Sequence, residues 1–242
     1  MKIGIVGPGR LGRSLQGLLK DAGYEVSLHG RDSRPQAVEV CLLTVPDSAV
    51  AEVASGLTTG PCVLHCAGSL DLDVLEPHSR RGSFHPLMTF PGPEVAVPDV
   101  TDVPVALAGT SEAVVIGQRL ADDLGMRAFT VPGDRRLYHA AAVIAGNLVT
   151  VLLDEAATVL ERAGVPRATA YEVLQPLALR SVSNAHQGLR RALTGPIARD
   201  DRETLAAHRE ALAAQHPAAL PVYDAVVERA KAMVSEEDPE LP

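Results

Sequence analysis

The histidine at position 85 stands in the stretch G-S-F-H-P-L-M-T-F-P-G, residues 82–92, whose composition is unusual for this chain. The stretch holds Phe84 and Phe90, although the whole sequence contains only 3 phenylalanines and no tryptophan. The proline after His85 favours an extended backbone, so the imidazole is expected at the end of a strand. Histidine exchanges protons near neutral pH more readily than other side chains, so we predict His85 as a proton donor. The alternative is a ring that only fills a turn.

A second histidine, His65, lies in the stretch P-C-V-L-H-C-A-G between two cysteines. On a strand, Cys62 and Cys66 share one face and His65 points to the other. The three side chains could bind one metal only if the chain turned between them. We therefore predict no metal site and interpret the cysteines as small buried hydrophobic residues. His65 remains a second candidate for chemistry.

The most specific motif is the turn G-P-G-R-L-G near the beginning of the sequence, between the apolar run K-I-G-I-V-G and a helical pattern of leucines. Its residues are Gly7, Pro8, Gly9, Arg10, Leu11 and Gly12. Glycines at this spacing allow a tight turn, the close approach of a pyrophosphate, and close packing of the helix on the strand. The free N–H groups of the helix start would bind the phosphates. We predict a dinucleotide site; the alternative is a glycine-rich turn without a ligand.

The end of the next predicted strand reads H-G-R-D-S-R and indicates which dinucleotide is preferred. A site for NAD carries an acidic residue about 20 residues after the glycine motif, where it binds the ribose hydroxyls. Arg31 occupies that place, with Ser33 and Arg34 close behind, and Asp32 is the alternative ribose ligand. A guanidinium suits the 2′-phosphate, because the two form bidentate, charge-assisted hydrogen bonds. The predicted cofactor is NADP.

Strands and helices alternate along the first part of the chain. Short apolar runs predict strands near residues 2–7, 24–31, 38–46, 61–68, 82–87, 103–109 and 126–131, and helical spacing predicts helices near 9–23, 47–57 and 111–125, the last two opened by Asp47 or Ser48 and by Ser111. This order is typical of an α/β, doubly wound and mostly parallel sheet with helical crossovers. We predict a Rossmann domain for NADP over residues 1–132 and an all-helical domain for substrate binding and dimerisation over residues 133–242.

A long helix is predicted over residues 135–163, because Gly164 and Pro166 are suited to end it and to begin the next helix. Its centre is apolar on every side, which predicts burial all round and a homodimer. The run H-A-A-A-V-I-A-G-N-L-V-T-V-L-L is shorter than the roughly 20 residues that span a bilayer, so no membrane association is predicted. Pro176 is expected to kink or divide the following helix. Two amphipathic helices are expected near residues 200–214 and 219–234.

The composition is that of an ordinary globular protein. The chain has 242 residues, 46% of them hydrophobic, and a formal net charge of −8. A nucleic-acid partner is not expected, since such a protein needs a strong basic patch and aromatic residues are only 3%. The 3 cysteines do not suit a disulfide framework, and the first residues lack the apolar region of a secretory signal. We expect a cytoplasmic protein whose partner is a small-molecule substrate.

With these motifs the chain resembles the 6-phosphogluconate-dehydrogenase-like superfamily, whose members join a Rossmann domain to an all-helical domain. Pyrroline-5-carboxylate reductases and prephenate dehydrogenases are among its members. The stretches GIVGPGRLG, LLTVPD, VLHCAGSL, SFHPLMTF, YHAAAVIAGN and TGPIARDD resemble more narrowly a bacterial branch of Rossmann-like NADP oxidoreductases with a C-terminal domain of unknown function. The resemblance covers nearly the whole chain but implies no substrate.

The resemblance implies roles for further residues. It assigns Gly7, Gly9 and Gly12 to the pyrophosphate turn and Arg31 to NADP selection. Thr44, Val45 and Pro46 match the loop that borders the cofactor, and His65 and Gly68 match the loop near the nicotinamide ribose. His85 and Pro86 resemble the His-Pro pair of prephenate dehydrogenases, where the histidine lies near the substrate. Asn147 lies on the helix that lines the cleft between the domains in this superfamily, and a buried amide there would need polar partners.

The chain also departs from the pattern at two places. The hydroxyacid-dehydrogenase relatives have a catalytic lysine one helical turn before the asparagine, where this sequence has Val143. His139, two turns before Asn147, is a possible substitute. The branch reads T-G-P-I-A-R-G-D where this chain has Asp200 in place of the glycine. If that position needs a left-handed backbone, aspartate tolerates it better than most residues.

Two functions of different classes follow. The first is an NADP-dependent oxidoreductase that transfers hydride to or from a small carbonyl or imine compound in the cleft between the domains. His85 would donate the proton, and His65, Asn147 or His139 would orient the reacting groups. The second is a non-catalytic protein that binds NADP as a sensor or scaffold, which the absent lysine favours.

Overall fold

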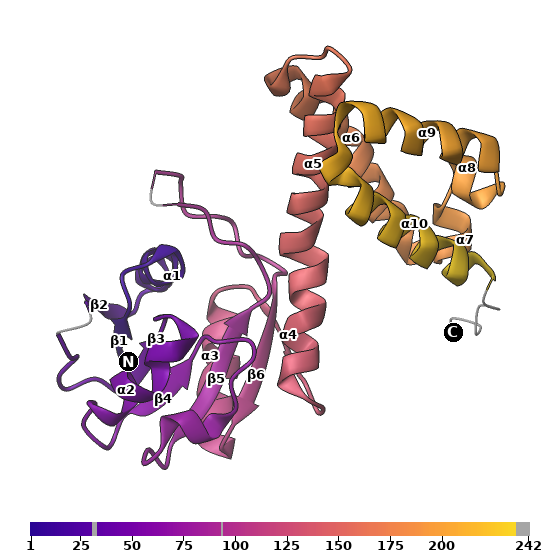
Figure 1. Cartoon of the computed structure of the whole chain (residues 1–242). Helices are drawn as coiled ribbons and strands as arrows, with labels where there is room; N and C mark the ends of the chain where they lie inside the picture. Colours follow the sequence, from indigo (N-terminus) through magenta and orange to yellow (C-terminus); the bar gives the residue numbers. More distant parts are fainter. Residues whose placement is uncertain (31–32, 93, 236–242) are drawn as a thin grey trace. The chain divides into compact units, whose positions relative to one another are not determined.

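The computed structural model describes residues 1–30, 33–92 and 94–235, and the chain divides into two compact units, Met1–Gly146 and Asn147–Pro242. Figure 1 shows a sheet with flanking helices in the first unit and helices in the second. The division falls inside the long helix, so the first turns of that helix belong to the sheet unit. The functional division after residue 132 stays a prediction.

The first unit is built on a 7-stranded sheet with the order β2-β1-β3-β4-β5-β6-β7. The strands are β1 (Lys2–Val6), β2 (Glu25–His29), β3 (Val40–Leu43), β4 (Cys62–His65), β5 (Arg81–Pro86), β6 (Pro104–Gly109) and β7 (Arg127–Thr130). Every neighbouring pair is parallel except β5 and β6, which are antiparallel. The prediction of a mostly parallel Rossmann sheet followed by helices is confirmed.

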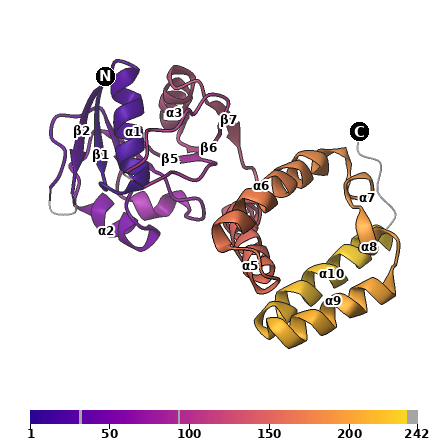
Figure 2. The same cartoon turned by 90° about the horizontal axis from the view of Figure 1, so that it is seen from above.

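Helices cover both faces of this sheet. They are α1 (Arg10–Asp21), η1 (Asp47–Ala49), α2 (Val50–Ser55), η2 (Leu72–Leu75), α3 (Ser111–Asp123) and α4 (Arg135–Val143). One apolar core joins the sheet to α1 and α3, and a second core on the other face joins it to α2 and η2 (Figure 2). Burial on both faces explains why the central strands β3 and β4 read as continuous apolar runs.

Local details of these elements differ from the sequence prediction at two helix starts. Thr110, not Ser111, caps α3, and its side chain accepts a hydrogen bond from the Ala113 N–H. Pro46 precedes η1, where no side chain caps the helix, so the proposed cap at Asp47 or Ser48 is wrong.

Cys62 and Cys66 both belong to the core under α1 and α3, in agreement with their predicted shared face.

The long helix is continuous from Arg135 to Arg162 but changes its winding in the middle. Between α4 and α5 (Val149–Arg162) it forms a π-helix at Ile144–Leu148. The prediction that its centre is buried all round is wrong for the single chain, since Ile144 is 62% exposed and Val151 58% exposed. In the single chain these apolar side chains are therefore not part of a core.

By length and hydropathy alone, the helix Arg135–Arg162 could cross a membrane, a test that core helices of soluble proteins also pass. Only 6% of its most apolar window is buried in this chain. The sequence-based argument that the apolar run is too short therefore does not hold for the whole helix. Asp154 and Glu155 in its second half both form ion pairs, with Arg167 and His216.

The second unit is all helical within residues 147–235. After α5 come α6 (Arg167–Asn184), η4 (Ala185–Gln187), α7 (Leu189–Ala192), α8 (Gly195–Ala198), α9 (Arg202–Gln215), η5 (Pro217–Ala219) and α10 (Leu220–Ser235). The helix α6 continues through Pro176, so of the two expectations the division is wrong and the kink stays a prediction. Asp200 has a φ of 49°, so this position has the left-handed backbone that aspartate was expected to tolerate.

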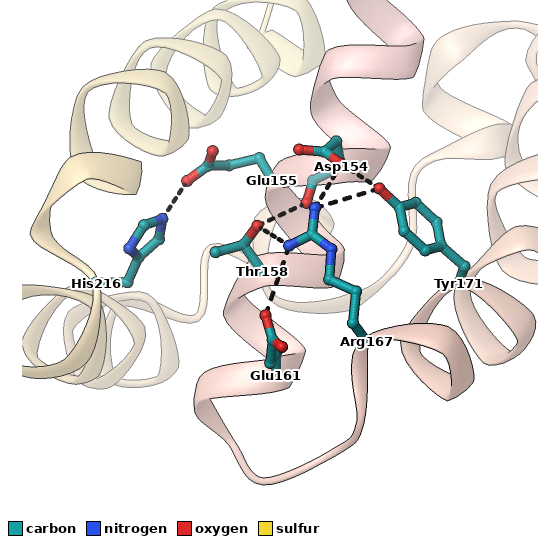
Figure 3. A network of polar contacts seen from close by, with 7 residues as sticks. All are labelled: Asp154, Glu155, Thr158, Glu161, Arg167, Tyr171 and His216. Carbon is teal, nitrogen blue, oxygen red and sulfur yellow. Dashed lines mark hydrogen bonds and ion pairs between the residues drawn. The ribbon is translucent and has the colours of Figure 1, made fainter.

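Arg167 joins α5 to α6 through several side chains (Figure 3). Its guanidinium donates to Asp154 Oδ1 at 2.6 Å and to Thr158 Oγ1 at 2.6 Å, and Tyr171 bonds to the same aspartate. A separate ion pair joins His216 Nε2 to Glu155 Oε1 at 2.8 Å. These contacts hold α6 and the segment before α10 against α5, so the helical unit has its own polar framework.

Candidate functional site

The turn between β1 and α1 has the geometry that phosphate binding requires. Gly7 has a φ of 119°, and a Cβ there would lie 2.7 Å from the Thr44 carbonyl oxygen. A Cβ on Gly12 would lie 2.0 Å from the Gly7 carbonyl oxygen, so helix and strand meet too closely for any side chain. A Cβ on Gly9 would meet nothing within 4 Å. Packing therefore requires glycine at positions 7 and 12. At Gly9 no protein atom occupies the space where a side chain would lie.

That space lies at the start of α1, where no side chain caps the helix. The first N–H groups of a helix have no partner inside it, and they carry the positive end of the helix dipole. Arg10 and Leu11 supply such groups beside the open face of Gly9. An anionic phosphate therefore fits this turn.

Side chains and backbone stiffen the turn. The Thr44 hydroxyl, just after β3, donates to the Gly7 carbonyl at 2.7 Å, and Arg13 Nε donates to the Pro8 carbonyl at 2.9 Å. Val45 and Pro46 continue from Thr44 into η1, beside the turn. The structure thus brings the predicted residues after β1 and after β3 together.

The segment predicted to select the nucleotide lies after β2. Arg31 and Asp32 are outside the described residues. Ser33 Oγ contacts Nδ1 of His29, the last residue of β2, at 2.9 Å, and Arg34 donates to the Ser33 carbonyl at 3.3 Å. Ser33 therefore lies close to the end of β2, next to the strand that leads into the glycine turn. The Arg34 guanidinium lies at the end of α2, where a Cβ on Gly56 would be 3.3 Å from its Nε.

The histidines lie at the same edge of the sheet. His65 ends β4, and His85 is one residue before the end of the parallel neighbour β5. The rings of His85 and His139 are 6.1 Å apart, and both pack over Gly68, where a Cβ would lie 2.5 Å from His139 Cδ2 and 3.0 Å from His85 Nε2. The carboxyl edge of a parallel sheet is where ligands bind in doubly wound folds. His65, Gly68, His85 and His139 thus form one cluster, here called the histidine edge.

Asn147 does not belong to the histidine edge. It opens the second compact unit, in the π-helix, and it is exposed. The interpretation of Asn147 as a buried amide is therefore wrong for the single chain. Short π-helical segments are frequent at functional sites. The predicted role of Asn147 toward a ligand stays a prediction.

Burial keeps His65 and His85 neutral at pH 7. His65 is 0% exposed, and burial, followed by the charge of Arg135, lowers its pKa to about 4, against the opposing effect of Asp47. Neither ring nitrogen of His65 reaches a hydrogen-bond partner, although the Ala67 backbone is near enough to act on its pKa. Burial, His139 and Arg135 lower the pKa of His85 to about 4 as well. At neutral pH neither side chain carries a proton beyond that of the neutral imidazole.

Two residues that the sequence did not single out complete this edge. Arg135 is buried at the start of α4, and donates from Nε to the Leu70 carbonyl at 3.0 Å and from Nη2 to the Ala67 carbonyl at 3.3 Å. Tyr138 Oη lies 2.6 Å from His85 Nδ1. The sequence held one signal, the pair Tyr138-His139 at a helix start that follows the last strand. No group of three or more His, Cys, Asp or Glu in residues 1–30, 33–92 and 94–235 could hold a metal ion.

Comparison with known proteins gives one sequence match and several structural ones. A sequence profile described as "Domain of unknown function (DUF2520)" matches residues 103–230. No curated protein matches the chain.

Among solved structures, BF3122 of Bacteroides fragilis, described provisionally as an NADP oxidoreductase, has a TM-score of 0.80 at 22% identity and covers 96% of this chain and 98% of its own. The reductive aminase of Aspergillus terreus in complex with NADPH and ethyl levulinate has a TM-score of 0.70 at 15% identity, with coverage of 98% and 96%. The 1-pyrroline-5-carboxylate reductase of Streptococcus pyogenes has a TM-score of 0.61 at 17% identity, with coverage of 96% and 98%. At these identities the likeness shows a shared fold.

Proposed function

Because the chain belongs to the DUF2520 family, a family defined by a domain of unknown function, we propose its activity from its own site: an NADP-dependent oxidoreductase that acts on a small carbonyl or imine compound. The observation that carries this proposal is the open space at Gly9. It faces an uncapped helix start at the same edge of the sheet as His85. The solved structures of the same fold include proteins named as reductases and one with NADPH bound.

The residues of the turn would hold the cofactor as follows. The N–H groups at the start of α1 would bind the pyrophosphate, and Gly9 would let it approach the backbone. Arg31, Ser33 and Arg34 would bind the 2′-phosphate, as their position after β2 suggests. When bound, NADP supplies the hydride chemistry, while the protein supplies orientation and a proton path. The nicotinamide end would extend along the carboxyl edge toward Gly68 and the histidine edge.

The test of this function is a titration with NADPH and NADH, followed by nicotinamide fluorescence and melting temperature. We expect NADPH to bind at least about tenfold more tightly than NADH, a difference of about 1.4 kcal/mol. The double variant Arg31→Ala/Arg34→Ala should remove this preference and leave NADH binding unchanged, because only the 2′-phosphate loses its partners. Lys20→Ala, which removes an exposed charge at the end of α1, is the matched control and should change neither affinity.

Turnover separates the two candidate functions. If NADPH binds, carbonyl and imine compounds are screened with the wild-type protein and with His85→Ala, and the oxidoreductase proposal expects turnover that this variant loses. Tight NADPH binding without turnover on any of them would favour the non-catalytic sensor or scaffold. If neither nucleotide binds, both proposals fail.

We also propose that the active state is a cytoplasmic homodimer formed through the helical unit. This unit leaves large apolar side chains uncovered on α5, α6 and α10, among them Val151, Leu177 (63% exposed), Val182 and Val226. Of these, Val226 also lines a cavity of about 680 Å³ whose walls come mainly from apolar residues of α5, α9 and α10. Soluble monomers seldom expose a contiguous apolar patch above a few hundred Å², and a second copy of the same surface is the simplest cover.

Light scattering should therefore give about twice the chain mass of 25.4 kDa. Leu177→Glu should shift the protein toward the monomer, because a buried unpaired carboxylate opposes association. Val115→Glu is the control: Val115 is 68% exposed on α3 in the sheet unit, and its variant should remain dimeric. A wild-type monomer, or wild-type protein that binds lipid vesicles through the long helix, would contradict the homodimer.

A further inference from the structure

Tyr138 and His85 form a side-chain pair that no sequence motif describes. Tyr138 Oη lies 2.6 Å from His85 Nδ1, and the two residues are 53 positions apart. The phenol ring also meets Phe129 edge-on, with ring centroids 6.0 Å apart. Asp134 caps α4 and accepts from the Arg136 N–H at 2.8 Å, which fixes the helix turn that carries Tyr138. The pair is therefore held by the fold from several sides.

The direction of this hydrogen bond depends on the imidazole tautomer of His85, and the phenol proton of Tyr138 favours one of the two tautomers. Burial raises the pKa of Tyr138, against the effect of Arg135, so the phenol keeps its proton at neutral pH. Within the described residues its hydroxyl contacts only His85. A neutral imidazole has one acceptor nitrogen and one N–H. The arrangement that uses the phenol proton is O–H donating to Nδ1, which leaves the single imidazole proton on Nε2.

The other nitrogen of His85 points to the predicted ligand side. A Cβ on Gly68 would lie only 3.0 Å from His85 Nε2, so this nitrogen lies directly over the glycine that follows β4. In the part of the chain that the structure describes, Nε2 has no hydrogen-bond acceptor. The Nε2–H group is therefore free to donate to a ligand at the carboxyl edge.

We propose that Tyr138 and His85 act together as a proton relay, in which Tyr138 is the proton source and His85 transfers the proton to the bound substrate. This inference rests on the proposed oxidoreductase function. Bound NADPH would supply a hydride for the carbonyl carbon, and the carbonyl oxygen would then need one proton. The His85 Nε2–H bond breaks and an O–H bond forms on the substrate. Nδ1 takes the proton of Tyr138, and the resulting phenolate regains a proton from solvent.

The surrounding charges suit this relay. The Arg135 guanidinium carbon lies 6.0 Å from the centre of the Tyr138 ring, and Arg135 is buried, so a phenolate would form beside a cation. The other titratable groups that face His85 are His139, His65 and Asp47. A neutral His85 could not act as an imidazolium acid at neutral pH, whereas a relay needs only its neutral form. Tyr138 is thus a positioning and proton-supplying residue, and His85 is the group that touches substrate.

Nitrogen-15 NMR of the histidine rings tests the relay without any substrate or cofactor. The His85 signals are assigned by their loss in His85→Gln. In the wild-type protein we expect Nε2 to carry the proton and Nδ1 to show the shift of a hydrogen-bonded acceptor. In Tyr138→Phe, which keeps the ring and its edge contact with Phe129, the Nδ1 shift should change. In Tyr171→Phe, the control that removes a phenol hydroxyl bonded to Asp154, it should not change. A proton on Nδ1 in the wild type would overturn the relay.

Kinetics provides the second readout. Tyr138→Phe should lower the reductive kcat by about 10²–10⁴-fold and leave the Kd of NADPH unchanged. If wild-type protein does not bind NADPH, the proposed function fails while the NMR result still decides the pairing. If NADPH binds and Tyr138→Phe turns over normally, the relay fails alone.

Should Tyr138→Phe not fold, uniform 3-fluorotyrosine labelling replaces it. The label keeps every side chain in place and makes the phenols more acidic, so it should move the pH dependence of kcat to lower pH. An unmoved profile would contradict the relay.

Discussion

Replacing Gly12 by alanine should unfold or severely weaken the protein, whereas replacing Gly9 by alanine should leave it folded and unable to bind NADPH tightly. A Cβ on Gly12 would lie 2.0 Å from the Gly7 carbonyl oxygen and 2.6 Å from Thr44 Oγ1, so the backbone must move. Overpacking against backbone costs on the order of 3 kcal/mol, a large share of the stability of a domain.

Gly9→Ala is the matched control for stability. A Cβ on Gly9 meets nothing within 4 Å, and the residue has a φ of −76°, which alanine adopts without strain. Loss of the favourable glycine cap should cost under about 1 kcal/mol. The added methyl occupies the space proposed for the pyrophosphate, so NADPH affinity should fall by about tenfold or more.

Both effects can be checked by urea unfolding of the wild type, Gly12→Ala and Gly9→Ala, and by NADPH titration of those that fold. Equal stability of Gly12→Ala and wild type would refute the account of close helix–strand packing. Unchanged NADPH affinity in Gly9→Ala would refute the placement of the pyrophosphate at the turn.

Acid should destabilise the protein through His65. Its pKa is about 4 in the folded chain, below the value of about 6.5 expected for an unfolded histidine. Because the unfolded state takes up the proton first, stability falls as the pH drops from about 6.5 toward about 4. A difference of this size corresponds to about 3 kcal/mol for one fully buried group.

His65→Leu isolates this effect. Both ring nitrogens of His65 lack hydrogen-bond partners, so an apolar side chain of similar size should be neutral or stabilising at pH 7.5. In denaturant unfolding between pH 4.5 and 7.5, the free energy of unfolding of His65→Leu should rise relative to that of the wild type as the pH falls. The carboxylates titrate alike in both proteins, so the difference between them reports on His65. A constant difference across this range would mean that His65 is not buried neutral. Loss of turnover with stability intact would indicate instead that the ring serves the reaction.

The phosphate turn and the sheet could be predicted from the sequence because their signals are local. The spacing of Gly7, Gly9 and Gly12 between an apolar run and a leucine-rich helix dictates one backbone geometry, and the structure has it. The position of His85 before a proline, at the end of an apolar run, likewise placed it at the carboxyl edge of the sheet. The spacing of apolar residues and the positions of glycine and proline along the chain are enough for such predictions.

Only the tertiary structure determines which distant side chains come into contact and which protonation state the buried histidines have. Tyr138 joins His85 across 53 residues, and Arg135 reaches the Leu70 carbonyl across 65, distances over which no spacing rule operates. The neutral state of His65 and His85 depends on burial, which is a property of the packed fold. Burial of the long helix also depends on the packed fold. Its sequence predicted burial on every side, whereas Ile144 and Val151 are exposed in the single chain. Apolar composition indicates which surface favours burial, and only the packed chain shows which of its residues are covered.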